Sequence, residues 1–124
     1  MVSSSLRAFV RERAGDRCEY CRLDSESFPY IPFHIEHIIA RKQGGQSIAE
    51  NLALSCHKCN LHKGPNLSGF DVKLGVVTLF HPRLQDWEAH FRMEGPMIIG
   101  LTDQGRVTVD VLAMNAPKRV ELRA

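Results

Sequence analysis

The segment FHIEHII, residues 33–39, places ionisable side chains inside an apolar, β-branched run. Ile35 and its apolar neighbours suit a core strand, but Glu36 and His37 are costly to bury without partners. An imidazole changes its charge near neutral pH, so it can accept a proton in a reaction. An acid beside a base therefore indicates a strand that carries out chemistry.

The four cysteines form two C-x-x-C pairs, Cys18 with Cys21 and Cys56 with Cys59. Two such turns with no leftover thiol predict a tetrahedral zinc site with four thiolate ligands. Because thiolates would fill every position, we expect this zinc to be structural. Two disulfides are the alternative, disfavoured by a reducing cytosol, and a redox motif would need only one pair.

Local patterns predict the elements that must hold these residues. Residues 3–15 read as a helix capped by Ser4 or Ser5 and ended by Gly15. After the first cysteine pair we expect a loop at 23–32, a strand at 33–39 and an irregular loop at 40–50. A short strand at 51–55 and a short helix at 57–64 follow.

The pattern weakens after residue 65. Trp87 and Phe91, four residues apart, are expected in a core rather than as a platform for bases. Residues 75–80 and 95–101 suggest strands, whereas residues 83–93 could form either a helix or a strand. Residues 105–115 alternate like a strand, although their length and flanks also allow a helix. A last helix is expected to begin at Pro117.

Composition fits one globular domain over residues 1–124, with 44% hydrophobic and 24% charged residues. The first 15 residues lack the continuous apolar run of a secretory signal. The longest apolar stretches are also too short to span a bilayer. We therefore expect a soluble, cytoplasmic protein with no membrane partner.

Positive charge clusters around the motifs, although the net charge is only +2. Residues 1–22 carry five arginines against three acidic residues, and residues 41–63 carry four basic side chains against Glu50 alone. Such clusters are expected on a surface that meets phosphate. Ordinary solvated charge is the alternative.

Four pieces in this order and spacing resemble an HNH endonuclease of the ββα-metal (His-Me finger) superfamily, in its zinc-stapled, four-cysteine subgroup. They are CEYC, EHIIARKQGG, ENLALSCHKCN and HKG, and they cover residues 18–64. The resemblance implies an α+β fold, with a small ββα-metal core and a four-cysteine zinc site. An N-terminal helix and a C-terminal α/β extension, residues 65–124 and of unassigned role, would flank this core.

The resemblance also implies four catalytic residues. His37 would be the general base, and Glu36 and Asn60 would hold a catalytic Mg²⁺ or Mn²⁺ ion, since oxygen ligands suit these metals. Asn60 departs from the literal third letter of the motif, although asparagine is a known ligand there. Asn51 would brace the loop that orients His37. A turn cap for Asn51 and a plain helix residue for Asn60 are the alternatives.

Other side chains near the motif could contact the backbone of DNA or RNA. His34 shares a strand face with Glu36, and Lys63 shares a helix face with Asn60. A half-exposed bystander and solvated charges are the alternative interpretations. The candidates are His34, Arg41, Lys42, His62 and Lys63.

The expected function is that of a divalent-metal-dependent HNH endonuclease that hydrolyses DNA phosphodiester bonds. The alternative is a catalytically inactive, zinc-stapled module that binds nucleic acid. Such a module would need the cysteines and the basic clusters, but not Glu36, His37 and Asn60 together. Their joint presence favours the enzyme.

Overall fold

The computed structural model describes residues 2–124. The chain, expected as one domain, divides into two compact units, Met1–Leu61 and His62–Ala124. All of the proposed catalytic residues and all four cysteines belong to the first unit. Among the helices of residues 2–124, none has the length and apolar character needed to cross a bilayer.

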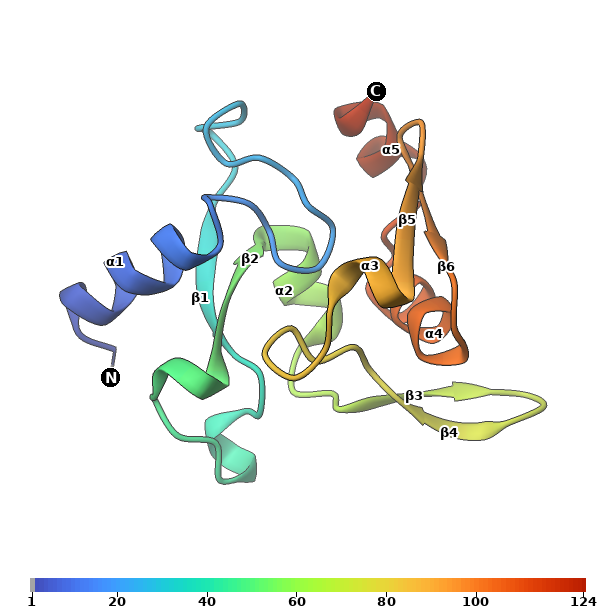
Figure 1. Cartoon of the computed structure of the whole chain (residues 1–124), viewed down its shortest axis with the longest axis horizontal. Helices are drawn as coiled ribbons and strands as arrows, with labels where there is room; N and C mark the ends of the chain where they lie inside the picture. The colour runs from blue at the N-terminus through green and yellow to red at the C-terminus, as the bar shows by residue number, and fades with distance from the viewer. Residues whose placement is uncertain (1) are drawn as a thin grey trace. The chain divides into compact units, whose positions relative to one another are not determined.

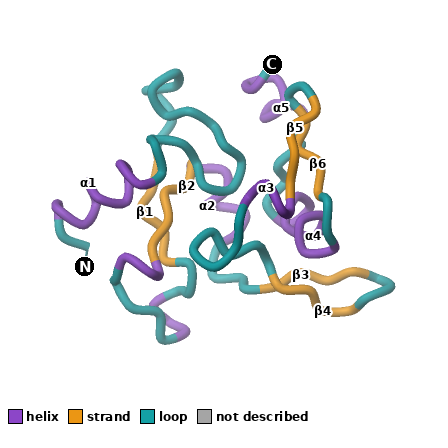
Figure 2. Tube along the Cα trace, viewed as in Figure 1, coloured by secondary structure: helices purple, strands orange, loops and turns teal. Residues whose placement is uncertain are grey.

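The first unit is built on a two-stranded antiparallel hairpin (Figures 1 and 2). Helix α1 (Ser4–Arg13) precedes strands β1 (Phe33–His37) and β2 (Leu52–Cys56), and helix α2 (His57–Lys63) follows β2 directly. Two short 3₁₀ helices, η1 (Arg41–Gln43) and η2 (Ala49–Asn51), lie between the strands. The order β1, β2, α2 confirms the expected ββα core.

The two faces of the hairpin hold different side chains. Residues directly opposite each other on paired strands share a face, and here Ile35 lies opposite Leu54, and Glu36 opposite Ala53. Leu54 and Ile35 pack against Val10 of α1. Glu36, one residue further along, therefore lies on the other face.

Local bonding sets the ends of α1 and β1. Ser3, rather than Ser4 or Ser5, caps α1, because its hydroxyl accepts a hydrogen bond from Leu6 N at 3.2 Å. Strand β1 stops at His37, two residues earlier than expected, because the backbone N–H and carbonyl of Ile39 both bond to the Asn51 side chain. The expected loop 23–32 and the helix closed by Gly64 are confirmed.

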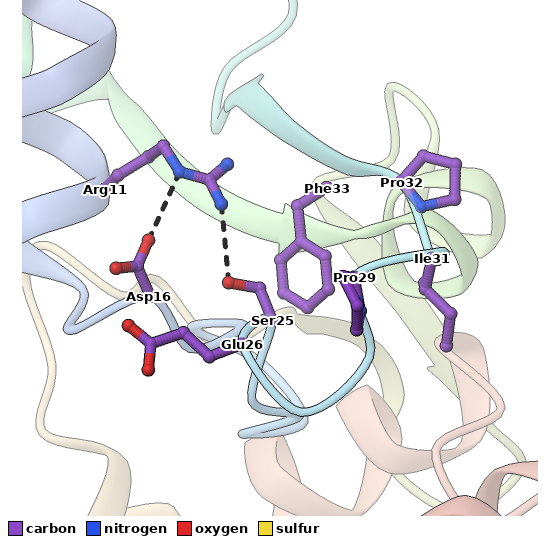
Figure 3. A pocket seen from close by; sticks show the side chains of 8 residues that line it. All are labelled: Arg11, Asp16, Ser25, Glu26, Pro29, Ile31, Pro32 and Phe33. Carbon is purple, nitrogen blue, oxygen red and sulfur yellow. Dashed lines mark hydrogen bonds and ion pairs between the residues drawn. The ribbon is translucent and has the colours of Figure 1, made fainter.

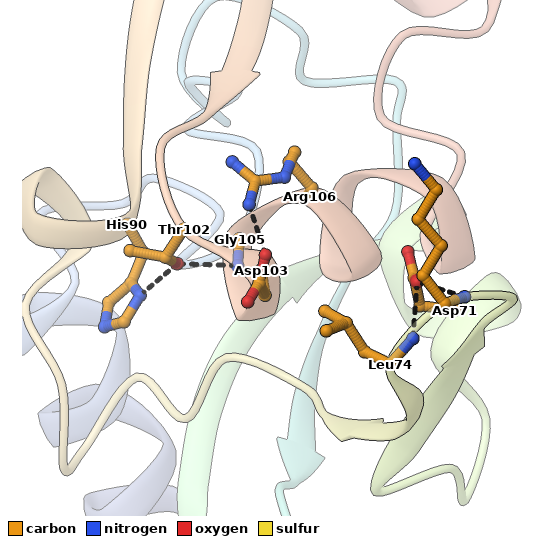
Figure 4. Close-up of polar contacts among 8 residues, drawn as sticks. Asp71, Leu74, His90, Thr102, Asp103, Gly105 and Arg106 are labelled. Carbon is orange, nitrogen blue, oxygen red and sulfur yellow. Dashed lines mark hydrogen bonds and ion pairs between the residues drawn. The ribbon is translucent and has the colours of Figure 1, made fainter.

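The second unit contains two hairpins and most of the remaining helices. Its elements are β3 (Ser68–Asp71), β4 (Gly75–Thr78), α3 (Trp87–His90), β5 (Phe91–Glu94), β6 (Met97–Gly100), α4 (Asp103–Val111) and α5 (Pro117–Arg123). Figure 4 shows side-chain hydrogen bonds that fix two of these elements. In the β3–β4 hairpin, Asp71 accepts from the backbone N–H groups of Lys73 and Leu74 in the turn. At the start of α4, Thr102 accepts from Gly105 N at 2.9 Å.

Two expectations for this unit were wrong or incomplete. Most of 105–115 is helical rather than a strand, because the Thr102 cap begins α4 and one helix side is buried at Gly105 and Thr108. Strand β3 was not expected, since Gly69 and Asp71 are poor strand formers. The core role of Trp87 and Phe91 and the last helix from Pro117 are confirmed.

Candidate functional site

The four cysteine sulfurs gather in one buried cluster. Their Sγ atoms all lie within 4.8 Å of one another, and Cys21 Sγ lies 3.7 Å from Cys56 Sγ. Tetrahedral Zn²⁺ with bonds of about 2.3 Å would separate its sulfurs by about 3.8 Å. A disulfide needs about 2 Å. The cluster therefore fits a structural zinc ion, and it excludes a disulfide between Cys21 and Cys56.

Each pair of cysteines adopts a tight turn suited to a metal. The backbone N–H of Cys21 points at Cys18 Sγ, and that of Cys59 points at Cys56 Sγ, both at 3.5 Å. Burial raises the pKa of the Cys18 and Cys59 thiols well above the usual range. A bound cation would offset the free-energy cost of ionising these buried thiols, because it stabilises the thiolates.

The two residues inside the first knuckle both reach the hairpin. Glu19 binds Leu54 of β2 twice: its N–H donates to Leu54 O at 2.9 Å, and its carboxylate accepts from Leu54 N at 2.8 Å. Tyr20 donates its hydroxyl to Glu36 Oε1 of β1 at 2.6 Å. Burial, followed by the charge of Glu36, raises the pKa of Tyr20 well above its ordinary value, so the hydroxyl stays a donor. Neither Glu19 nor Tyr20 was expected from the sequence.

His37 lies at the end of β1 and is half-buried. Its Nε2 forms a hydrogen bond of 2.8 Å with the Oγ of Ser47. Ser47 was not among the residues expected in the site. Burial lowers the pKa of His37, and the positive charge of Arg41 lowers it further. The imidazole is therefore neutral near pH 7, with Nδ1 as the ring nitrogen not engaged by Ser47.

Asn51 is buried and joins both ends of the loop after β1. Its Oδ1 accepts from Ile39 N at 2.9 Å, and its Nδ2 donates to Ile39 O at 3.0 Å and to Gln46 O at 2.9 Å. Arg13 of α1 supports this residue from outside, because it donates to the carbonyls of Ala49 and Leu52 at 3.0 and 2.7 Å. The loop around His37 is therefore held by side chains.

Gly45 is the point of closest approach in this loop. A Cβ atom built there would lie 1.7 Å from Ile39 O and 2.9 Å from Asn51 Nδ2. Gly44 beside it has a φ of +92°, which favours glycine. In this pair, expected only as part of an irregular loop, Gly44 is thus favoured by its backbone conformation and Gly45 by its close approach to Ile39 and Asn51.

Glu36 and Asn60 carry side-chain oxygens and belong to the other face of the hairpin and to the helix that lies over it. Glu36 is 6% exposed, and His34 on the same face bonds to His57 of α2, with Nε2 and Nδ1 3.1 Å apart. The start of α2 therefore lies over this face, and Asn60 follows one turn later, half-buried. A buried carboxylate and an amide are a donor set that fits Mg²⁺ or Mn²⁺.

The candidates for substrate contacts differ in exposure. Arg41 and Lys42 are exposed on η1, and His62 is exposed on α2. His34 is half-buried and already bonded to His57. Lys63 is only 2% exposed, the reverse of what a contact with phosphate requires.

A separate hollow of about 500 Å³ lies in the first unit (Figure 3). Arg11 at its edge forms an ion pair with Asp16 at 3.2 Å and donates to Ser25 at 3.3 Å. The rest of its lining comes mainly from Pro29, Phe33 and their neighbours, and none of the expected catalytic residues lines it. The hollow is therefore distinct from the site around His37.

Comparisons with known proteins point to one family. Residues 18–66 match the family model of the HNH endonucleases. The chain is also 28% identical over 119 residues to the Septu protein PtuB of Bacillus thuringiensis. That alignment covers 93% of this chain and 43% of the relative, so the chain spans less than half the length of that protein. No solved structure matches.

The family match covers both zinc knuckles and the strand that carries Glu36 and His37. It includes Asn51 and Asn60 as well. This similarity agrees with the ββα order and with the four-cysteine cluster. Residues 18–66 are therefore similar to an HNH endonuclease domain.

Proposed function

We propose that this protein is a divalent-metal-dependent endonuclease that hydrolyses phosphodiester bonds in DNA. The observation that carries the proposal is the setting of His37 within the matched segment. Its imidazole is held through Nε2 by Ser47, and its pKa is lowered by burial and by Arg41. A fixed, neutral imidazole is the form that can accept a proton from water.

Each residue then has one task. His37 takes a proton from the attacking water on Nδ1, which is worth about 10²–10⁴-fold in rate. Glu36 and Asn60 would hold the divalent ion with their side-chain oxygens. When bound, this ion supplies positive charge to the scissile phosphate and to the departing oxygen. Asn51 keeps the loop around His37 in place through its three hydrogen bonds.

The end of β1 lets an acid and a base act at one place. In a regular strand, Glu36 and His37 would point to opposite sides. Because β1 ends at His37, the backbone leaves the regular strand geometry there. The exposed side chains of Arg41 and Lys42 follow within five residues and are suited to contact the phosphate backbone.

A zinc-stapled binding module without turnover is the second candidate. The observation that favours it is the burial of Glu36 and its hydrogen bond with Tyr20, because a purely structural carboxylate would be held in the same way. The two candidates differ in whether DNA is cleaved at all, and the endonuclease alone requires His37.

Cleavage of supercoiled circular DNA tests the proposal. The zinc-loaded protein should convert it with Mg²⁺ or Mn²⁺, but not when the divalent ion is omitted or captured by EDTA. The His37→Ala variant should lose this activity, while Tyr30→Phe, a change at an exposed ring of the same unit, should keep it. Tight DNA binding with no cleavage under either metal would instead support the binding module.

A further inference from the structure

The first zinc knuckle carries a side chain that reaches the proposed catalytic carboxylate. Tyr20 lies between two zinc-binding positions, Cys18 and Cys21, and its ring is fully buried. The two bonds between Glu19 and Leu54 fix the same knuckle to β2. The position of the Tyr20 hydroxyl is therefore set on both sides, by the metal cluster and by the hairpin.

That hydroxyl donates to Glu36 Oε1 at 2.6 Å. This is the short distance expected when a hydroxyl bonds to an ionised carboxylate. A glutamate side chain has several rotatable bonds, and freezing them costs free energy. Holding one carboxylate oxygen in advance fixes the orientation of the other and removes part of that cost from ion binding.

We propose that Tyr20 is a positioning residue, which uses the zinc knuckle as its support to orient Glu36 for the catalytic divalent ion. The inference rests on the proposed function, since it takes Glu36 as a ligand of that ion. The zinc knuckle would then have a second task besides stability, because through Tyr20 it orients the carboxylate that binds the catalytic ion. Removing a residue that hydrogen-bonds to a metal ligand typically lowers the affinity for the metal by about 10–100-fold.

Binding of Mn²⁺ to the zinc-loaded full chain tests the inference without relying on activity. The Tyr20→Phe variant removes only the hydroxyl, and Tyr30→Phe, at a tyrosine that is 74% exposed in the same unit, is the matched control. We expect Tyr20→Phe to keep its zinc and to raise the dissociation constant for Mn²⁺ by about 10-fold or more, measured by the EPR signal of free Mn²⁺. Glu36→Gln should weaken binding at least as much.

A second measurement uses the unchanged protein, in case Tyr20→Phe does not fold. Bound Mn²⁺ is paramagnetic and should broaden the NMR signals of the Tyr20 ring well before those of Tyr30. Tyr20 signals that stay sharp at saturating Mn²⁺, or no Mn²⁺ binding at all, would overturn the inference. So would a Tyr20→Phe protein that binds Mn²⁺ as tightly as the wild type.

The two proposals fail separately. If Tyr20→Phe binds Mn²⁺ normally while the wild type still cleaves DNA and His37→Ala does not, only the role of Tyr20 is lost. If Mn²⁺ binding by the wild type is weakened by both Glu36→Gln and Tyr20→Phe but the wild type cleaves no DNA, the endonuclease proposal is lost and the positioning of Glu36 stands.

Discussion

The imidazole of His37 owes its proposed role to its neighbours. Ser47 engages one ring nitrogen, and burial disfavours the charged ring. Arg41, four residues further on, adds a like charge that disfavours protonation again. A histidine that stays neutral at lower pH than usual remains a base over a wider range.

Removing the charge of Arg41 should raise the pKa of His37. In the Arg41→Ala variant the repulsion is gone but burial, the larger cause, remains, so the pKa should rise only part of the way towards 6.5. An NMR titration of the His37 ring measures this directly. Because the protonated ring cannot act as a base, the acid limb of the cleavage rate should move to higher pH as well.

Lys42→Ala is the matched control, since Lys42 is an exposed cation next to Arg41 but is not among the causes of the shift. A change in the pKa of His37 of the same size in both variants would contradict a specific effect of Arg41.

Among elements, the loop between β1 and β2 depends on one tightly packed backbone. Asn51, at the end of this loop, bonds to Ile39 at its start and to Gln46 in its middle, and Gly45 passes so close to Ile39 that there is no room for a side chain. We call the Asn51 side chain and its bonds to Ile39 and Gln46 the clamp. The clamp takes up the backbone groups of Ile39 that would otherwise continue the strand, and so β1 ends at His37.

The Gly45→Ala variant should break the clamp. A methyl group 1.7 Å from Ile39 O must push the backbone away and disrupt the bonds of Asn51. We expect a loss in the free energy of unfolding of about 1–3 kcal/mol, the usual cost of overpacking, measured by denaturant titration. Cleavage should fall further than stability explains, because His37 loses its fixed position.

Gly15→Ala is a suitable comparison, because a Cβ there meets nothing within 4 Å and the strain it adds comes from the φ of +63° alone. Equal losses of cleavage in both variants would show that a general loss of stability, and not the disruption of the Asn51 hydrogen bonds, is responsible.

Local signals explain which elements could be predicted. Pro117 begins α5, and the residues after Cys56 form the expected helix, because proline, glycine and cysteine spacing act over a few residues. The end of β1 at His37 could not be predicted, since it depends on Asn51, 14 residues away in sequence. Tyr20 and Ser47 were missed for the same reason: each gains its role from a partner 16 or 10 residues away.

At the scale of the whole molecule, the two units should depend on zinc to different extents. The buried apolar cluster of the first unit around α1 and the hairpin centres on Val10, Leu52 and Leu54. A core this small gives limited stability, and a bound metal commonly supplies the rest. The second unit contains no cysteine.

The Cys59→Ser variant should therefore lose zinc and unfold the first unit first. Trp87 is the single tryptophan of the chain and lies in the second unit, so its fluorescence reports that unit alone. We expect the methyl NMR signals of Val10 and Leu54 to lose their native dispersion while the Trp87 emission stays native-like. Loss of both signals together would show that zinc stabilises the whole chain as one cooperative unit.

The most direct measurement of the central claim is the cleavage rate of His37→Ala under conditions where its binding of Mn²⁺ is also recorded. The account predicts that this variant keeps its zinc, binds Mn²⁺ like the wild type and cleaves DNA about 10²–10⁴-fold more slowly. A His37→Ala protein that cleaves at the wild-type rate would contradict the account.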